Sequence, residues 1–501
     1  MKRAIFIAPF LLFSFITFSQ STFQKMFPAI DKYIDSILKD WHIPGLALGI
    51  VYKDQLIYSR GYGYRNLEQK LPVEATTLFP IASNTKLFTA TAAAMLEEEG
   101  QIDLDKPVRN YMPTLIFIND ELNTKVTLRD MLSHRTGLPR YDAIWVGSDI
   151  SRKDAISKVV YMKPRLGFRE GYIYNNMMYA SAGLVLETVT GKSWENIIGE
   201  KIFKPLQMNA TVFSKDDMVK YGNYAIGYFE KDSTRQLLPK KFDVQSVALG
   251  PAGIIKSSVE DMSHWMIAQL NDGLYQGKQT ISSKAIKETL VPNIIADKES
   301  KYDELSNALY AMGRNIETYK GYKIATHTGS VDGFYSNLTL VPALKLGVFM
   351  IHNGEAGGSL RTVMAFPVIE RLLGLSITPW SQRYLADYKI AVARDKHVSD
   401  SVKATQAKGT SPSHALSSYA GTYTSPLYGS MMIELVDDGL TIAFKKIRSP
   451  LLHFHYDQFI TNVEGTDLPS FRLNFLTNSK GEINSISTSL FGDPVEIFVK
   501  K

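Results

Sequence analysis

The chain has 501 residues, of which 45% are hydrophobic and 21% charged, and its formal net charge is +6. This length exceeds one ordinary hydrophobic core, so we expect two or more domains of a globular protein. The positive charge is spread along the chain without a basic run, which argues against a nucleic-acid partner. The chain has no cysteine, so disulfides, a thiol nucleophile and a thiolate zinc site are excluded.

The N-terminal stretch MKRAIFIAPFLLFSFITFSQ has a basic start, a short apolar run and a small, polar end. This pattern predicts a secretory signal peptide over residues 1–19, cut before Gln20. The alternative is an N-terminal membrane anchor, although the apolar run is shorter than the roughly 18 residues of a spanning helix. We therefore expect an exported protein, periplasmic or secreted, with no integral membrane segment after cleavage.

The next segments predict a helix followed by a hairpin. Isoleucines 30, 34 and 37 recur at helical spacing before Pro44-Gly45 ends the run, and two strands are expected around Lys53-Asp54-Gln55. Residues 85–99 predict an alanine-rich helix closed by Gly100. Between residues 101 and 320 helical patterns alternate with loops rich in glycine and proline.

At the head of the alanine-rich helix, Ser83 and Lys86 form an S-x-x-K pattern. A serine hydroxyl becomes a nucleophile when a base takes its proton, and a buried lysine with a lowered pKa can be that base. Positions i and i+3 share a helix face, and a helix start offers free backbone N–H groups to an oxyanion. The pattern alone is weak, because a second copy, Ser36 and Lys39, lies in an amphipathic helix where it is ordinary surface.

Two further short patterns accompany the first. Tyr174-Asn175-Asn176 reads as Y-x-N, and His327-Thr328-Gly329 reads as H-x-G, where S-D-N and K-T-G are the better-known forms. Each pattern recurs elsewhere in the chain, so neither is specific by itself.

The order of the segments is more informative. HIPGLALGIVYKDQLIYSRGYG, TTLFPIASNTKLFTA, TLRDMLSHRTGLPRYD, GFREGYIYNNMMYASAGLVLETVTGKSW and THTGSVDGFYSNLTLVP follow one another over about residues 30–353. In this order they resemble the serine β-lactamase and penicillin-binding-protein superfamily, on its class C-like branch.

The resemblance implies roles for individual residues. Ser83 would be acylated, Lys86 would take or hold its proton, and Tyr174 would relay the proton to the leaving group. Asn176 would orient Lys86 and bind a substrate carbonyl. The remaining implied site residues belong to the third motif: His327 in place of a cationic lysine, Thr328 and Gly329 beside the substrate, and Ser330, whose N–H would join that of Ser83 in an oxyanion hole.

The third motif departs from the better-known pattern. A histidine at position 327 would be only partly charged at neutral pH and would hold a carboxylate less firmly than lysine does. This argues against antibiotic hydrolysis as the main task, so β-lactamase activity is expected to be minor. In the resemblance, such branches look like esterases, D-aminopeptidases and amidases. Asn175, where many relatives have serine, is not expected to react, and His134 in the loop LSHRTG is expected to be structural.

The C-terminal part predicts a separate domain. Residues 386–417 turn polar and predict a helical tail and linker, and residues 418–501 predict short strands with turns at Asp438-Gly439 and at residues 479–481. These strands resemble the lipocalin-like domain appended to some of these hydrolases. It would restrict the active-site cleft or, alternatively, bind an apolar ligand. A metal site at His453 and His455 is disfavoured, since no third ligand is evident.

Together the patterns and the resemblance imply an α+β hydrolase domain over residues 20–385. Its antiparallel sheet would be flanked by helices, with a mostly helical lobe inserted between Gly100 and about Trp265. The spacing of the C-terminal strands suggests a small barrel or sandwich, and the resemblance to the lipocalin-like domain implies a small all-β barrel. The expected function is hydrolysis of a small-molecule or short-peptide substrate through a Ser83 acyl-enzyme, with no metal or cofactor. The alternatives are a penicillin-binding or wall-sensing protein that acylates without efficient turnover, and a scaffold that has lost the chemistry.

Overall fold

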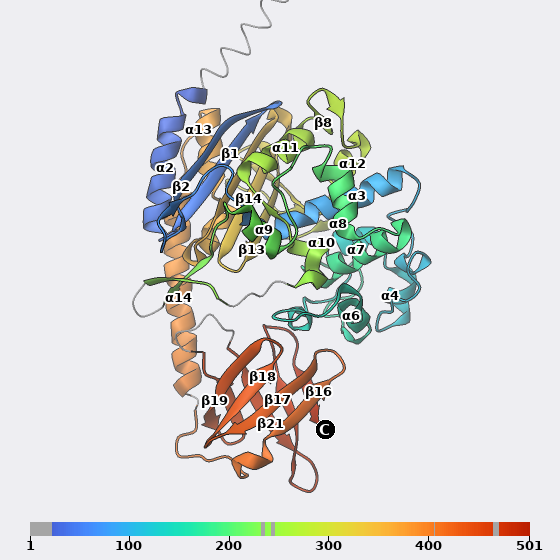
Figure 1. Ribbon diagram of the computed structural model, residues 1–501, viewed down its shortest axis with the longest axis vertical. Helices are drawn as coiled ribbons and strands as arrows, with labels where there is room; N and C mark the ends of the chain where they lie inside the picture. The colour runs from blue at the N-terminus through green and yellow to red at the C-terminus, as the bar shows by residue number, and fades with distance from the viewer. Residues whose placement is uncertain (1–22, 232–235, 242–245, 405, 464–469) are drawn as a thin grey trace, which may run out of the picture.

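The computed structural model describes residues 23–231, 236–241, 246–404, 406–463 and 470–501. The predicted signal peptide lies outside these residues. The described chain forms an α+β domain and a C-terminal β-barrel, connected by the long helix α14, Trp380–Ala404 (Figure 1). The predicted fold class is confirmed.

A nine-stranded antiparallel sheet forms the centre of the first domain, in the order β10-β11-β12-β13-β14-β15-β1-β2-β3. The strands are β1 Gly45–Tyr52, β2 Gln55–Asn66, β3 Leu71–Pro72, β10 Ile294–Ile295, β11 Leu309–Tyr310, β12 Asn315–Tyr319, β13 Tyr322–Val331, β14 Phe334–Val341 and β15 Leu346–His352. The predicted hairpin of β1 and β2 is confirmed. Because β1 pairs with β15, Leu46 opposite His352, the first and last strands of the domain meet inside the sheet.

The alternation of side chains along β1 explains why both sheet faces are covered. Leu46, Leu48 and Ile50 pack on one face beneath α2 (Phe27–Asp40), α13 (Phe366–Leu373) and α14. Ala47 and Val51 point to the other face, where α11 (Val259–Leu270) and the helical lobe lie. A sheet buried on both faces is a stable platform, since each fully buried leucine or isoleucine contributes roughly 1.5–3 kcal/mol.

The predicted mostly helical lobe after Gly100 is confirmed, and its helices pack around α3, Thr85–Glu98, which precedes the predicted lobe. Eleven of the fourteen α3 residues are buried, and Phe88 stacks on Trp265 with ring centroids 4.1 Å apart. The other helices beyond the sheet are α4 Asp120–Lys125, α5 Leu128–Leu132, α6 Arg152–Ile156, α7 Asn176–Thr190, α8 Trp194–Ile198, α9 Lys215–Tyr221, α10 Gly250–Gly253 and α12 Ser283–Glu288. The short strand pairs are β4 Phe79–Pro80 with β7 Lys256–Ser257, β5 Tyr228–Lys231 with β6 Gln236–Pro239, and β8 Leu274–Tyr275 with β9 Lys278–Gln279.

The C-terminal strands close into an antiparallel barrel. They are β16 Gly421–Ser425, β17 Gly429–Val436, β18 Gly439–Phe444, β19 Ile447–His455, β20 Gln458–Thr461, β21 Arg472–Thr477, β22 Ile483–Thr488 and β23 Glu496–Lys500. Tyr423, Phe459 and Phe475 are buried with their rings in contact, so large side chains fill this part of the barrel. The range 386–417, predicted as a linker, includes the C-terminal part of α14.

Two further observations concern membrane and metal. In the part of the chain that the structure describes, no helix combines the length and the apolar character needed to span a bilayer. Within the same residues, no three histidine, aspartate or glutamate side chains gather closely enough to hold a metal ion. His453 bonds to the Tyr456 carbonyl at 2.8 Å, and His455 accepts the Ala407 N–H at 3.2 Å.

Candidate active site

Ser83 lies in a short 3₁₀ turn, Ala82–Asn84, directly before α3. Ala82 has φ +49°, in the left-handed region, which costs a non-glycine residue on the order of 1–3 kcal/mol. The turn is held by Asn84, whose amide nitrogen donates to Ser336 Oγ at 2.7 Å, and Ser336 in turn donates to the Ile81 carbonyl at 2.9 Å. The sheet therefore stabilises the strained turn that presents Ser83.

Two predicted site residues contact the Ser83 hydroxyl. Lys86 Nζ lies 3.1 Å from Ser83 Oγ, and the Tyr174 hydroxyl donates to the same oxygen at 2.8 Å. Ser83 and Lys86 are adjacent through the helix, whereas Tyr174 comes from the segment before α7. The structure thus brings the first two motifs together on one oxygen atom.

Lys86 is fully buried, and its amine has two other partners. It donates to Asn176 Oδ1 at 2.9 Å and to the Ala252 carbonyl at 2.7 Å. Burial lowers the pKa of Lys86 well below its usual value, and the positive charge of Arg140 lowers the pKa further. A lysine in this setting is available as a neutral amine at a pH where an exposed lysine is charged.

Tyr174 packs against His134, with ring centroids 4.3 Å apart. Burial in this cluster raises the pKa of Tyr174 to about 12, so its hydroxyl keeps its proton at neutral pH. His134 is fully buried and accepts the Asn175 backbone N–H at 3.1 Å. The predicted structural character of His134 agrees with this position behind the tyrosine.

Asn175 and Asn176 have different tasks at the start of α7. Asn175 caps the helix by accepting the Met178 N–H at 3.1 Å, as asparagine commonly does at this position. Its amide nitrogen also donates to the Leu138 and Pro139 carbonyls, at 3.1 and 2.6 Å. Asn176 faces Lys86. Asn175 therefore fixes the backbone at the start of α7, and the Asn176 side chain is part of the site.

His327 lines the cavity that contains Ser83, but it is not a cation. Burial lowers the pKa of His327 to about 3, and the positive charge of Lys86 in its protonated form lowers this pKa further. Its Nδ1 lies 2.7 Å from the Thr328 carbonyl, which can only accept, so the proton is on Nδ1. Nε2 then accepts from the Tyr310 hydroxyl at 3.1 Å. The expectation of a partly charged imidazole at neutral pH was wrong, because the ring is buried and both nitrogens have partners.

The remaining residues of the third motif are at the end of β13. In the described chain, residues 327–331 pair with β14 alone, because the pairing with β12 ends at Thr326, so this stretch forms a local edge. Thr328 and Ser330 line the cavity. Gly329 faces away from it: a Cβ there would lie 2.3 Å from the Ile81 carbonyl oxygen. The close approach that requires glycine is therefore to the Ser83 turn, whereas we expected it to be to the substrate.

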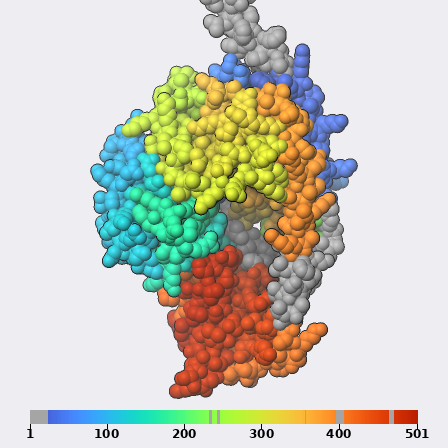
Figure 2. Space-filling view, turned by 180° about the vertical axis from the view of Figure 1, so that it is seen from behind, coloured from blue at the N-terminus to red at the C-terminus, as the bar shows by residue number. Residues whose placement is uncertain are grey.

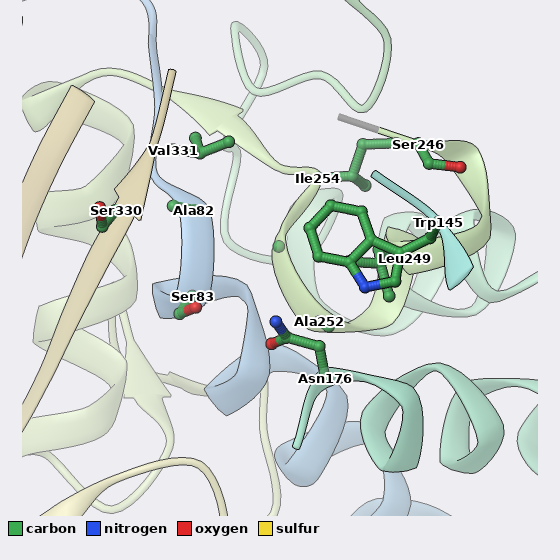
Figure 3. A pocket seen from close by; sticks show the side chains of 11 residues that line it. Ala82, Ser83, Trp145, Asn176, Ser246, Leu249, Ala252, Ile254, Ser330 and Val331 are labelled. Atoms are coloured by element: carbon green, nitrogen blue, oxygen red, sulfur yellow. The ribbon is translucent and has the colours of Figure 1, made fainter. Parts of the chain in front are cut away.

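Two hollows meet at Ser83 and Ser330. One is polar, about 400 Å³ in volume, and is lined by residues that include Tyr174, His327, Arg140 and Arg361. The other is mainly apolar, with Trp145, Leu249 and Ile254 on its wall (Figure 3). The site can therefore accept a molecule with chemically different groups on the two sides of Ser83.

Sequence reasoning missed Asp142, although it ends the quoted segment TLRDMLSHRTGLPRYD. Asp142 is mostly buried and accepts three hydrogen bonds: from Asn176 Nδ2 at 3.2 Å, Trp145 Nε1 at 3.0 Å and Arg140 Nε at 2.6 Å. This carboxylate fixes the amide of Asn176 so that the oxygen faces Lys86. The R-x-D pattern after Leu-Pro was the available signal.

The barrel contacts the loop that carries Asp142, and Figure 2 shows the red barrel against the helical lobe. Asp493 of the barrel accepts the backbone N–H groups of Asp142 and Ala143, at 3.2 and 2.9 Å. Lys445 donates to the carbonyls of Ala143 and Ile144. A continuous set of hydrogen bonds thus runs from the barrel through Asp142 and Asn176 to Lys86.

Comparison with known families agrees with this architecture. Residues 30–370 match the family model described as Beta-lactamase, and residues 405–497 match a domain of unknown function, DUF3471. The chain belongs to the beta-lactamase family. The resemblance to the serine β-lactamase and penicillin-binding-protein superfamily is thereby confirmed.

Related proteins and solved structures cover most of the chain. An unguisins hydrolase, ungD, of Aspergillus violaceofuscus is 28% identical over 439 residues, which are 81% of this chain and 76% of that protein. Protein flp of Staphylococcus aureus strain N315 is 30% identical over 337 residues, 65% of this chain and 62% of that one.

Solved structures share the fold at low identity. The octameric penicillin-binding protein homologue of Pyrococcus abyssi aligns with a TM-score of 0.62 and 22% identity, over 94% of this chain and 99% of that one. SurE, in a crystal structure with D-Leu, aligns with a TM-score of 0.56 and 17% identity, over 95% and 100%. At these identities the likeness supports the fold alone.

The contact between the barrel and the loop gives a first prediction. In Asp493→Ala the buried N–H groups of Asp142 and Ala143 lose their acceptor, at a cost of roughly 1–3 kcal/mol. We expect the loop to shift and kcat on a p-nitrophenyl ester to fall about tenfold or more, because Asn176 is no longer fixed.

The matched control is Asp457→Ala. Asp493 also accepts from the Tyr428 hydroxyl at 3.2 Å. Asp457 is likewise a barrel carboxylate that accepts from a tyrosine hydroxyl and a backbone N–H, those of Tyr419 and Ser413, and neither residue lines a hollow of the site. Its ester kcat should stay within about twofold of wild type. Equal losses in the two variants would refute the specific role of Asp493.

A second prediction concerns Gly329→Ala. The added methyl group would lie 2.3 Å from the Ile81 carbonyl and 2.4 Å from Ser336 Oγ, so β13 must move away from the Ser83 turn. Overpacking of this kind costs typically 1–3 kcal/mol, and we expect lower thermal stability together with reduced ester hydrolysis. Gly439→Ala is the control, because a Cβ at this barrel position would make only an ordinary contact, 3.9 Å from the Val436 carbonyl oxygen, and it should leave both measurements unchanged.

Proposed function

We propose that this protein is an exported serine hydrolase that cleaves ester or amide bonds of small molecules or short peptides through an acyl-enzyme on Ser83. The observation that carries the proposal is the pair of proton-handling groups on one oxygen: Lys86 Nζ at 3.1 Å and the Tyr174 hydroxyl at 2.8 Å. Membership of the beta-lactamase family supports it, as does the relative named as a hydrolase of unguisins. Export rests on the basic and apolar N-terminal stretch.

The hydrogen bonds of Lys86 support its role as the base. A neutral amine has two N–H groups and one lone pair. Asn176 Oδ1 and the Ala252 carbonyl accept the two N–H groups, which leaves the lone pair for the hydroxyl proton of Ser83. The buried amine can therefore take the proton as Ser83 Oγ attacks the substrate carbonyl.

Tyr174 complements the base as a proton donor. Its raised pKa keeps the hydroxyl protonated, and that hydroxyl already points at Ser83 Oγ. When the acyl bond to Ser83 forms, Tyr174 gives its proton to the leaving alcohol or amine and regains one from Lys86. Water then attacks the acyl-enzyme, and the same two groups act in the reverse order.

The substrate carbonyl oxygen would bind between the backbone N–H groups of Ser83 and Ser330, the two residues shared by both hollows. Loss of one such donor typically costs roughly 3–4 kcal/mol in the transition state. The solved structure of SurE with D-Leu supports including D-amino-acid derivatives among the substrates to be tested. A wall-sensing protein that acylates without turnover would use the same first step.

A third prediction tests the nucleophile. Ser83→Ala should fold normally and lose on the order of a thousandfold or more of its p-nitrophenyl ester hydrolysis, because Ser83 is the hydroxyl hydrogen-bonded to Lys86 among the described residues. A fluorophosphonate probe should add its mass to Ser83 in the wild type only. The control is Ser36→Ala, the serine of the other S-x-x-K pattern, which is exposed on α2 and should keep full activity.

Release of the acyl group separates the two functional alternatives. If hydrolysis is the function, the acyl-enzyme formed with an ester substrate should disappear from the mass spectrum at the rate of turnover. An acyl group that stays on Ser83 for hours would favour the alternative, a wall-sensing protein that acylates without efficient turnover. Unchanged ester hydrolysis in Ser83→Ala would refute the site itself.

A fourth prediction concerns pH. Lys86 acts as a base only when neutral, so kcat/KM should fall with decreasing pH as Lys86 gains a proton. Arg140 lowers the pKa of Lys86 by charge repulsion, so Arg140→Gln should raise that pKa. The acid limb of the pH profile of kcat/KM should then move to higher pH. Arg165→Gln removes the same charge from an exposed position outside both hollows and should leave the limb in place. If the acid limb moves equally in both variants, the specific effect of Arg140 on the pKa of Lys86 would be contradicted.

A further inference from the structure

On the basis of the acyl-enzyme function proposed above, we infer that Arg140 binds a carboxylate of the substrate. The preferred substrates are then molecules with an anionic group on one side of the scissile bond and an apolar group on the other. The acyl-enzyme chemistry does not require this charge, so the inference adds a substrate class to the reaction.

The guanidinium of Arg140 is held in place while most of its donors stay open. Its Nε donates to Asp142 Oδ2 at 2.6 Å, and its central carbon lies 5.2 Å from the centre of the Tyr174 ring. The side chain is 49% exposed and lines the polar hollow together with Ser83. Among the described residues, neither terminal nitrogen of Arg140 has a protein partner. Two parallel N–H groups of arginine match the two oxygens of a carboxylate.

Asp142 leaves the terminal N–H groups of Arg140 without an acceptor. Its Oδ1 accepts from Asn176 and Trp145, and its Oδ2 takes only the Nε proton of Arg140. Four of the five N–H bonds of the guanidinium therefore remain. Asp142 orients the arginine without occupying the edge of the guanidinium that faces the hollow.

The charges around the polar hollow favour an anion. Among the described residues that line it, Arg140 and Arg361 are cations and none is a carboxylate. His327 is neutral, because burial lowers its pKa to about 3. An anionic group entering this hollow meets two guanidinium groups and no carboxylate on the described lining, since Asp142 lies behind Arg140 and is paired with it. Its attraction to the guanidinium groups is strengthened by the partly buried surroundings.

The backbone of the Arg140 loop is fixed on both sides, which reduces the entropy lost on binding. On one side Asn175 donates to the Leu138 and Pro139 carbonyls. On the other side Asp493 of the barrel accepts the N–H groups of Asp142 and Ala143. The carboxylate-binding residue is thus presented by a loop that both domains support.

The second hollow supplies the apolar half of the specificity. Trp145, Leu249 and Ile254 line it, and it shares Ser83 and Ser330 with the polar hollow (Figure 3). A substrate whose carbonyl lies at Ser83 can place an apolar group against Trp145 and a carboxylate against Arg140.

Two ester substrates that differ only in charge test the inference. They are the phenylacetyl esters of 3-hydroxybenzoate and of 3-hydroxybenzamide, measured as kcat/KM at pH 7.5 for wild type, Arg140→Gln, Arg140→Lys and Arg165→Gln. The wild type should prefer the benzoate. In Arg140→Gln the benzoate-to-benzamide ratio should fall roughly 10- to 100-fold, as expected for loss of a charged hydrogen bond. Arg140→Lys should keep part of the preference, and Arg165→Gln should keep all of it.

The benzoate-to-benzamide ratio of kcat/KM separates an effect on carboxylate binding from an effect on catalysis. Disturbance of Asp142 or Tyr174 in Arg140→Gln would slow both esters alike and leave the ratio unchanged, and that result would overturn the inference. An equal fall of the ratio in Arg165→Gln would also overturn it, because the effect would then be that of overall charge. If the wild type hydrolyses neither ester and Ser83 gains no acyl mass, the proposed function itself fails, which is a different outcome.

Discussion

The burial of one amine, Lys86 Nζ, is the constraint on which the rest of the site depends. A buried charge costs several kcal/mol, so the fold favours the neutral form of this lysine and thereby its use as a base. A neutral amine still needs partners for two N–H groups, and Asn176 and the Ala252 carbonyl provide them. The direction of the remaining lone pair, toward Ser83 Oγ at 3.1 Å, is a consequence of these two bonds.

The same constraint explains why the barrel bears on the chemistry. Asn176 can present its oxygen to Lys86 only if its NH₂ group has an acceptor elsewhere, and Asp142 is that acceptor at 3.2 Å. Asp142 lies on a loop whose backbone N–H groups bond to Asp493 of the barrel. The appended domain is therefore part of the support of the site, in addition to any effect on the size of the cleft.

The sequence was sufficient for the strands, the helices and the residues around Ser83, because each has a local pattern, and the resemblance of the ordered segments supplied their arrangement. A short apolar run before a turn predicted β1, and the S-x-x-K spacing at the head of a helix predicted the contact of Ser83 with Lys86. The bonds of the Asp142 loop to Asp493 could not be predicted, since Asp493 is 351 residues from Asp142 in sequence. The pair of Arg140 and Asp142 was missed although both residues lie in one short segment, because its place beside Asn176 depends on the packed fold. The charge of His327 was misjudged because burial, which lowers its pKa, is a property of the packed fold.

The cost of burying a charge also explains why the cation of the polar hollow is at residue 140 and not at residue 327. A permanent cation at residue 327 would be buried close to Lys86 at a cost, because burial already lowers the pKa of His327 to about 3 and the charge of a protonated Lys86 lowers it further. Arg140 avoids much of that cost, because its side chain is 49% exposed and paired with Asp142. A half-exposed, paired arginine can keep its charge at every physiological pH, whereas a buried imidazole without a carboxylate partner cannot. A neutral residue at 327 and a cation at 140 are thus two aspects of one arrangement, in which charge is placed where solvent and Asp142 can stabilise it.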